Sequence, residues 1–102
     1  MKIEFSRAVN YKDSELSAVE MDLESLTGND LIAVEENFRR KYPNGQLWGT
    51  AYAGYIAAKS AHVPAEVILN LPVNDYFKIV NAVWDFFGGI NSKESQPQNT
   101  GE

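Results

Sequence analysis

The chain contains no cysteine, and His62 is the single histidine among its 102 residues. Without cysteine there are no disulfides, no thiolate zinc sites and no thiol catalysis, which fits a reducing cytoplasm. A metal site or general base built on His62 would need partner side chains, and no second histidine or cysteine supplies them. A structural or surface role for His62 is therefore favoured. We expect no cofactor, no bound metal and no enzymatic activity.

Basic residues and long apolar runs are also scarce. Nine Lys and Arg stand against fourteen Asp and Glu, which gives a formal net charge of −5. A nucleic-acid partner requires clustered Lys and Arg, so none is expected. No apolar run approaches the roughly 18 residues of a membrane span. The first residues, MKIEFSRAVNYKDSE, lack the apolar core of a signal peptide, so we expect a soluble cytoplasmic protein.

The chain does contain the apolar content of one ordinary globular domain, with 44% hydrophobic residues. Near the N-terminus, apolar and charged residues alternate with the period of two that is typical of half-buried strands, and the turn-forming segment NYKDS separates two such runs. This pattern predicts a β-hairpin over residues 2–24. The rest has the helical period. We therefore expect a mainly α fold, with three main helices and a short helix in one domain over residues 1–89.

The first helix is predicted over about residues 28–41, because both of its ends carry local signals. Thr27 followed by Asp30 resembles a capping box, in which two side chains satisfy amide groups that the helix leaves free. Three basic residues, Arg39 to Lys41, occupy the last turn, where the helix dipole favours cations. Pro43 then ends the helix.

The second helix, predicted over about residues 47–61, has two unlike faces. Small residues share one face, and large aromatic residues share the other, namely Trp48, Tyr52 and Tyr55. Small side chains allow a neighbouring helix to approach closely, while the aromatic face fills a wider space. We expect this helix to lie between other elements.

Prolines bracket a short helix at about residues 64–70, and the last helix is predicted over residues 73–87, ending at Gly88-Gly89. The segment over residues 90–102 is polar, so we predict a flexible tail. The last helix carries more apolar surface than a surface helix normally buries. We expect its main stripe to face the core, namely Val73, Tyr76, Phe77, Val80, Val83, Trp84 and Phe87.

A second stripe on the last helix consists of Ile79, Ala82 and Phe86. Either this helix is central and covered on several sides, or the second stripe contacts another chain. The second alternative makes these three residues, together with the aromatic face of the second helix, the candidate protein-binding residues: Ile79, Ala82, Phe86, Trp48, Tyr52 and Tyr55.

Two further features have simpler interpretations than catalysis. The segment GTAYAG, residues 49–54, has two glycines of a phosphate loop but lacks the Lys-Ser/Thr that such loops require, so close helix packing is favoured.

Residues 13–36 hold eight acids and no Lys or Arg. Several of these acids alternate with apolar strand positions and would form a solvated face, although a surface for a basic segment stays open.

Two stretches, LTGNDLIAVEENF and AAKSAHVPAEVILNLPVNDYFKIVNAV, resemble the small tail assembly chaperones of long-tailed bacteriophages. The family's recurring marks are a Thr-Gly-x-Asp-Leu helix start, an Ala-rich helix and a Val-Pro, Leu-Pro, Asp-Phe/Tyr series. The resemblance covers roughly residues 15–87. The marks fall at Thr27, Gly28, Asp30, Leu31, Ala57, Ala58, Ala61, Val63, Pro64, Leu71, Pro72, Asp75, Tyr76 and Phe77.

The resemblance implies a non-enzymatic role in the host bacterial cytoplasm. Such chaperones bind the tape measure protein, keep it soluble and help recruit the tail tube protein during assembly, and they are generally absent from the mature virion. Further implied partners are a frameshifted longer form of the protein and other copies of itself. The alternative is another small α-helical protein-binding module, such as an antitoxin or a phage-encoded inhibitor of a host protein.

Overall fold

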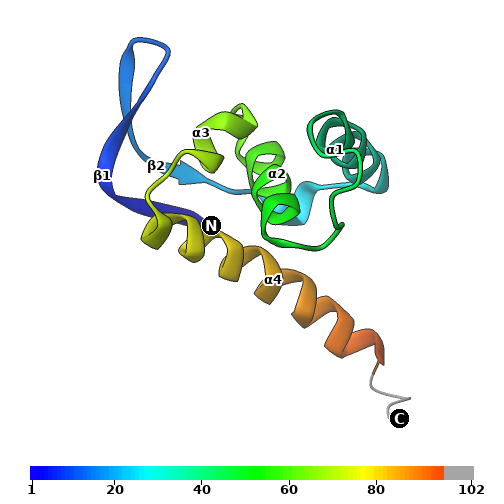
Figure 1. The fold of residues 1–102 in the computed structure, drawn as a ribbon. Coiled ribbons are helices and arrows are strands. Elements are labelled where there is room, and N and C mark those ends of the chain that lie inside the picture. Colours follow the sequence, from blue (N-terminus) through cyan, green and yellow to red (C-terminus); the bar gives the residue numbers. More distant parts are fainter. Residues whose placement is uncertain (96–102) are drawn as a thin grey trace.

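The computed structural model describes the backbone of residues 1–95 and the side chains of residues 1–88. A two-stranded antiparallel hairpin precedes a helical body, so the expected mainly α fold with an N-terminal hairpin is confirmed (Figure 1). The elements in chain order are β1 (Lys2–Tyr11), β2 (Ser14–Glu20), the 3-10 turn η1 (Leu23–Ser25), α1 (Gly28–Lys41), α2 (Thr50–Ala61), α3 (Ala65–Leu69) and α4 (Val73–Ser95).

The hairpin turns at Lys12 and Asp13, which have φ of 53° and 61°. Two consecutive positive φ angles are typical of the type I′ turn, whose twist matches that of paired strands. The expected alternation in the second strand stops at Glu20, because Leu23 belongs to η1. As Figure 1 shows, the turn end of the hairpin projects away from the helices.

The pairing of β1 with β2 is irregular between Glu4 and Val9, and a contact with α4 lies within this interval. The Ser6 N–H donates to both carboxylate oxygens of Asp75, at 2.9 and 3.0 Å, and the Ser6 hydroxyl donates at 2.9 Å. The Asp75 side chain is completely buried, and Lys78 Nζ lies 3.6 Å from it. A buried carboxylate therefore holds the hairpin against the start of α4.

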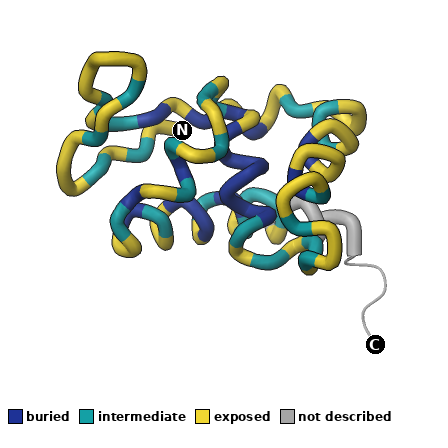
Figure 2. The backbone as a smooth tube through the Cα atoms, turned by 45° about the horizontal axis from the view of Figure 1, so that its top comes forward, coloured by how far each residue is buried: buried dark blue, intermediate teal, exposed yellow. Residues whose placement is uncertain are grey.

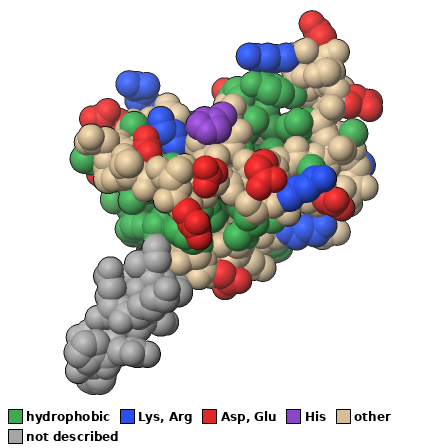
Figure 3. Space-filling model, turned by 180° about the vertical axis from the view of Figure 1, so that it is seen from behind, with side chains coloured by type: hydrophobic (Ala, Val, Ile, Leu, Met, Phe, Trp, Pro, Cys, Tyr) green, Lys and Arg blue, Asp and Glu red, His purple; other side chains and the backbone are tan. Residues whose placement is uncertain are grey.

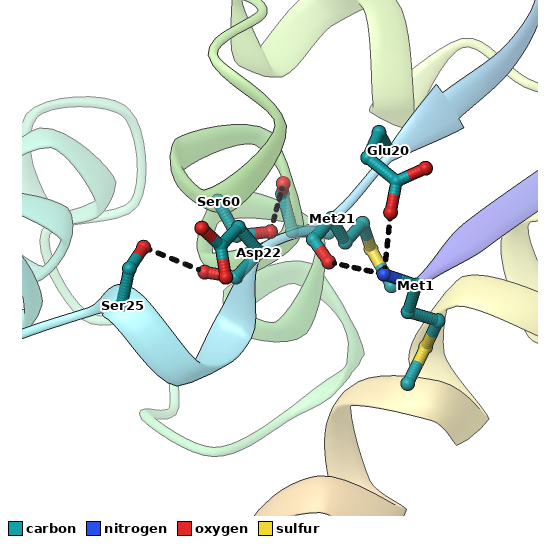
Figure 4. Close-up of polar contacts among 7 residues, drawn as sticks. Met1, Glu20, Met21, Asp22, Ser25 and Ser60 are labelled. Carbon is teal, nitrogen blue, oxygen red and sulfur yellow. Dashed lines mark hydrogen bonds and ion pairs between the residues drawn. The ribbon is translucent and has the colours of Figure 1, made fainter.

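The base of the hairpin is fixed separately, as Figure 4 shows. The Met1 ammonium donates to the Glu20 carboxylate at 2.6 Å and to the Met21 carbonyl at 2.9 Å. One residue further, the Asp22 N–H donates to the Ser60 carbonyl at the end of α2, at 3.1 Å. The hairpin is thus attached to the helical body at two places, through α2 and through α4.

α1 spans the predicted residues and begins with the predicted capping box. The Asp30 N–H donates to the Thr27 hydroxyl oxygen at 3.2 Å, and the Thr27 N–H donates to the Asp30 carboxylate at 2.9 Å. The Thr27 N–H lowers the pKa of Asp30, although burial acts against it. Local hydrogen bonds of this kind define a helix start without help from distant residues.

α2 begins at Thr50, so the predicted start at residue 47 is wrong. Trp48 has a φ of 68°, a left-handed conformation that cannot belong to a right-handed helix. The expected position of α2 between other elements is confirmed, because it contacts α1, α3 and α4 and is the most buried helix (Figure 2). On its small-residue face, a Cβ on Gly54 would lie 2.6 Å from the Tyr76 hydroxyl of α4.

α3 lies within the predicted range, but α4 continues past its predicted end at Phe87. Glycine ends a helix when it adopts the left-handed conformation, and Gly88 does not. The predicted tail over residues 90–102 is therefore helical up to Ser95. The rest of the predicted tail, residues 96–102, lies outside the described residues.

The inward face of α4 differs in part from the predicted one. Val80 and Val83 of the expected core stripe are buried, as predicted, but Val73 and Phe77 are 61% and 53% exposed, and Ile79 of the second stripe is completely buried. The hairpin contacts α4 at Asp75, and α2 also packs against α4, so Ile79 of the second stripe lies inward together with Val80 and Val83 of the main stripe. A hydrophobicity pattern contains no information on the hairpin contact, because its central residue is charged.

Candidate protein-binding surface

The structure places only one of the six candidate binding residues in a well-exposed position. Tyr52, Tyr55 and Ile79 belong to the buried core, so their expected surface position is wrong. The rings of Tyr52 and Tyr55 pack edge-on against Phe38 of α1, with centroids 5.5 and 5.6 Å away. Ala82 and Phe86 are half-buried and pack against this core.

Trp48 is 51% exposed, and it lies next to residues of α4 that the sequence pattern assigns to the core. Its ring centroid is 5.6 Å from that of Trp84 and 5.4 Å from that of Phe87, both of which are half-buried. Val73 and Phe77 lie on the same edge of α4 as Trp84. We call these five residues the apolar strip: Trp48, Val73, Phe77, Trp84 and Phe87.

Trp48 enters the strip through an unusual backbone conformation. A left-handed conformation costs a residue other than glycine roughly 1–2 kcal/mol. The contacts of the Trp48 ring with Tyr52, Trp84 and Phe87 offset this cost, yet about half of the side chain stays in water. Strained residues that are held in place by their surroundings occur preferentially at functional sites.

A hollow of about 470 Å³ opens beside these rings and is lined by Trp48, Trp84, Phe87 and Gly88. Seen from behind, hydrophobic side chains gather at the surface where the described side chains end (Figure 3). The described side chains that line the hollow present aromatic ring faces and edges, and none of them is a nucleophile or a titratable group. Its chemistry is that of a contact surface for apolar side chains.

The polar residues of α4 that flank the strip are Asn74, Lys78, Asn81 and Asp85. Lys78 is engaged elsewhere, because it is paired with Asp75 and donates to the Glu4 carbonyl at 3.2 Å. Neutral amides and a single carboxylate therefore border the outer side of the strip. Such a border favours recognition through apolar contact over recognition through charge.

The remaining sequence candidates have structural positions. His62 is exposed and adopts the left-handed conformation that ends α2. Within residues 1–88, no three His, Cys, Asp or Glu side chains are grouped as a metal site would require. Among the described helices, none has the length and apolarity needed to cross a membrane.

Val73 and Phe77 are the surface residues that the sequence prediction misses. Val73, Phe77 and Trp84 recur at intervals of four and seven residues, the spacing of a seam between packed helices. This signal is present in the sequence, but a seam inside the domain and a seam with a partner give the same pattern.

Comparison of the chain with protein-family models, with curated proteins and with solved structures finds no match. The function is therefore inferred from the surface and from the sequence pattern.

Proposed function

We propose that this protein is a bacteriophage tail assembly chaperone that binds the tape measure protein, keeps it soluble and helps to recruit tail tube subunits. The observation that carries the proposal is the apolar strip, in which Trp48, Val73 and Phe77 are each more than half exposed. These three account for most of the exposed large hydrophobic residues within the described side chains, and the Trp48 ring packs against Trp84 of the helix that carries the other two. Concentrated exposed apolar surface is typical of protein-binding sites.

The spacing of the strip fits a helical partner. Side chains that recur every three or four residues present ridges and hollows into which the side chains of another helix pack. A tape measure protein is a long helical protein with apolar faces that aggregate when they are exposed. Docking one such face on the strip would remove apolar area from water on both partners.

A non-enzymatic role agrees with the composition of the strip. A chaperone that acts by covering a surface needs matching apolar area, which Trp48, Phe77 and Trp84 supply, and it needs no reactive side chain. The order of the Thr-Gly-x-Asp-Leu, Val-Pro and Leu-Pro marks along the chain supports the phage family over other helical binding modules.

The proposal is tested by co-expressing the protein with a tape measure protein that aggregates alone, and by measuring how much of the latter stays soluble and co-purifies. Phe77→Ser should reduce co-purification at least about tenfold, since burial of a Phe side chain contributes about 1.5–3 kcal/mol. The variant should melt within a few degrees of the wild type, because its side chain is exposed.

Ile32→Ser is the matched control, because Ile32 is 56% exposed on α1 and is not part of the strip. It should leave co-purification unchanged. Equal loss of capture in the two variants, or no loss in either, would remove the strip from the binding site. Failure of the wild type to solubilise any tape measure segment would overturn the proposed function.

A further inference from the structure

The apolar strip runs along the outer side of α4. The main contacts of this helix are with α2 and β1, and both lie on one side of it (Figure 1). On the other side Phe77, Asn81 and Gly88 are exposed and Trp84 is half-buried. These four positions follow one another at intervals of four, three and four residues, the spacing of a coiled-coil seam. At 3.6 residues per turn they fall within an arc of roughly 60°.

The two ends of this seam have complementary shapes. At one end Phe77 is 53% exposed. At the other end lies the hollow of about 470 Å³ beside Trp48, Trp84, Phe87 and Gly88. No described atom lies within 4 Å of the position that a Cβ on Gly88 would take, so the hollow is open at this point. A ring that entered it would contact three other rings, and such aromatic contacts are favourable.

A surface that carries both a ring without cover and a hollow that can receive a ring can pair with itself about a two-fold axis. In an antiparallel pair of α4 helices, Phe77 of each copy lies opposite Gly88 of the other, and Asn81 lies opposite Trp84. The Trp84 indole N–H needs an acceptor once it is covered, and the Asn81 side-chain carbonyl can supply it. One asparagine within an apolar seam also fixes the register of the two helices.

The charges beside the seam favour the same arrangement. Lys78 and Asp85 directly follow Phe77 and Trp84, so they border the same side of the seam. Antiparallel pairing brings the Lys78 of each copy near the Asp85 of the other, which is an attraction between opposite charges. Lys78 keeps its contact with Asp75, but its side chain is 53% exposed, so its charge also acts on the outer side. Exposed ion pairs of this kind set orientation more than affinity.

We propose that a second copy of the chain covers the apolar strip in this antiparallel arrangement when no other partner is bound. The four aromatic side chains of the strip are already partly buried, so the pair removes roughly 1,000 Å² from water over both copies, the lower limit for a specific interface. An interface of this size is weak and reversible. A tape measure helix therefore displaces the second copy and takes its place. The displacement rests on the proposed function, whereas the pairing depends on the strip alone.

Sedimentation equilibrium of the full chain tests the pairing. Between about 1 μM and 1 mM the wild type should pass from monomer to dimer, with a dissociation constant above about 10 μM. Phe77→Ser should raise this constant at least about tenfold, because each dimer loses two buried rings. Ile32→Ser is the matched control, since Ile32 is 56% exposed on α1, and it should dimerise like the wild type.

Two charge reversals test the arrangement of the pair. Asp85→Lys and Glu36→Lys change the net charge equally, and both residues are exposed on helices. Asp85→Lys should weaken the dimer at least about threefold at low ionic strength, because it places a lysine near Lys78 of the other copy. Glu36→Lys should leave the dimer equal or slightly stronger, because it reduces the general repulsion between two acidic chains.

Spin labels measure the orientation directly, because a chain without cysteine gives an introduced thiol a unique address. In the antiparallel pair the two labels at Asp85→Cys should be offset by only about 8 Å along the helix axis, and those at Asn74→Cys by about 26 Å. A parallel pair would give similar distances at both positions. Adding a tape measure segment that the wild type captures should abolish the short distance at position 85.

Four results would overturn the proposal. A chain that stays monomeric at 1 mM, a dimer that Phe77→Ser leaves intact, or similar label distances at the two positions would remove the antiparallel pair. An unchanged short distance in a complex that holds the tape measure segment would remove the displacement. A monomer that still captures the tape measure protein leaves the proposed function intact, and a strip-dependent dimer that captures none leaves the pairing intact, so the two failures are distinguishable.

Discussion

The two sides of α4 are both apolar in sequence but have different environments in the structure. Ile79 and Val83 on one side are completely buried, while Val73 and Phe77 on the other are more than half exposed. The inner side is the one that carries Asp75, the charged residue held by the hairpin. The amount of apolar surface on a helix therefore does not predict which of its sides is buried within its own domain. The contacts of α4 with the hairpin and with α2 together decide which of its sides is buried.

The largest effect that separates the two sides is expected for Ile79→Ala. Removing a completely buried side chain leaves a cavity, and such changes cost about 2–5 kcal/mol of unfolding free energy. Val73→Ala on the exposed side should change the unfolding free energy by no more than about 0.5 kcal/mol. Urea unfolding followed by circular dichroism measures both values. Similar losses in the two variants would mean that the sides are not distinct.

A smaller loss of stability is expected for a substitution where α4 packs against α2. In Gly54→Ala the new methyl group would lie 2.6 Å from the Tyr76 hydroxyl, which donates to the Thr50 carbonyl at 2.5 Å and is therefore not free to move. Overpacking of this kind costs about 1–3 kcal/mol, measurable as a lower midpoint of thermal unfolding.

Gly28→Ala provides the comparison, because nothing lies within 4 Å of the position that its methyl group would take in the first turn of α1. This change should leave stability equal or raise it by up to about 1 kcal/mol, since alanine favours helix. If Gly54→Ala leaves the midpoint of thermal unfolding as high as Gly28→Ala does, α2 and α4 do not approach as closely at Gly54 as described.

A further effect, which depends on pH, concerns the charge at the centre of the inner side. Burial by itself raises the pKa of Asp75, but the hydrogen bonds from Ser6 and the Lys78 ammonium outweigh it, so the pKa lies below its usual value. A lowered folded-state pKa adds stability that is complete above the unfolded value of about 3.9 and is lost as the pH falls through the folded value.

Asp75→Asn should therefore lower the melting temperature at neutral pH and reduce its fall below about pH 4 relative to the wild type. Melting curves from neutral to acidic pH test this difference. Parallel pH profiles for the two proteins would show that Asp75 does not supply this stabilisation.

The accuracy of the sequence predictions follows the range of the interactions that decide each feature. The bounds of α1 are correct because Thr27 and Asp30 form a cap within four residues. The start of α2 is wrong because packing against Trp84 and Phe87 stabilises the left-handed conformation of Trp48, and these residues are far away in the sequence.

The candidate binding residues are less predictable than the fold. The sequence pattern identifies Trp48, but it assigns Phe77 to the core and Ile79 to the surface, because the position of the hairpin on α4 depends on Ser6 and Asp75. The sequence pattern also lists Tyr55 among the candidate binding residues, although its ring packs against Phe38 in the core.

The contact between Ser6 and Asp75 joins residues that are 69 positions apart in the chain. Closing so long a loop is entropically costly, whereas the paired ends of the hairpin need only its own two-residue turn. The turn end of the hairpin can therefore form early, but the irregular stretch between Glu4 and Val9 acquires its native shape only when α4 arrives. Refolding should thus show two separable rates, with the docking of α4 as the slower one, and Asp75→Asn should slow that step alone.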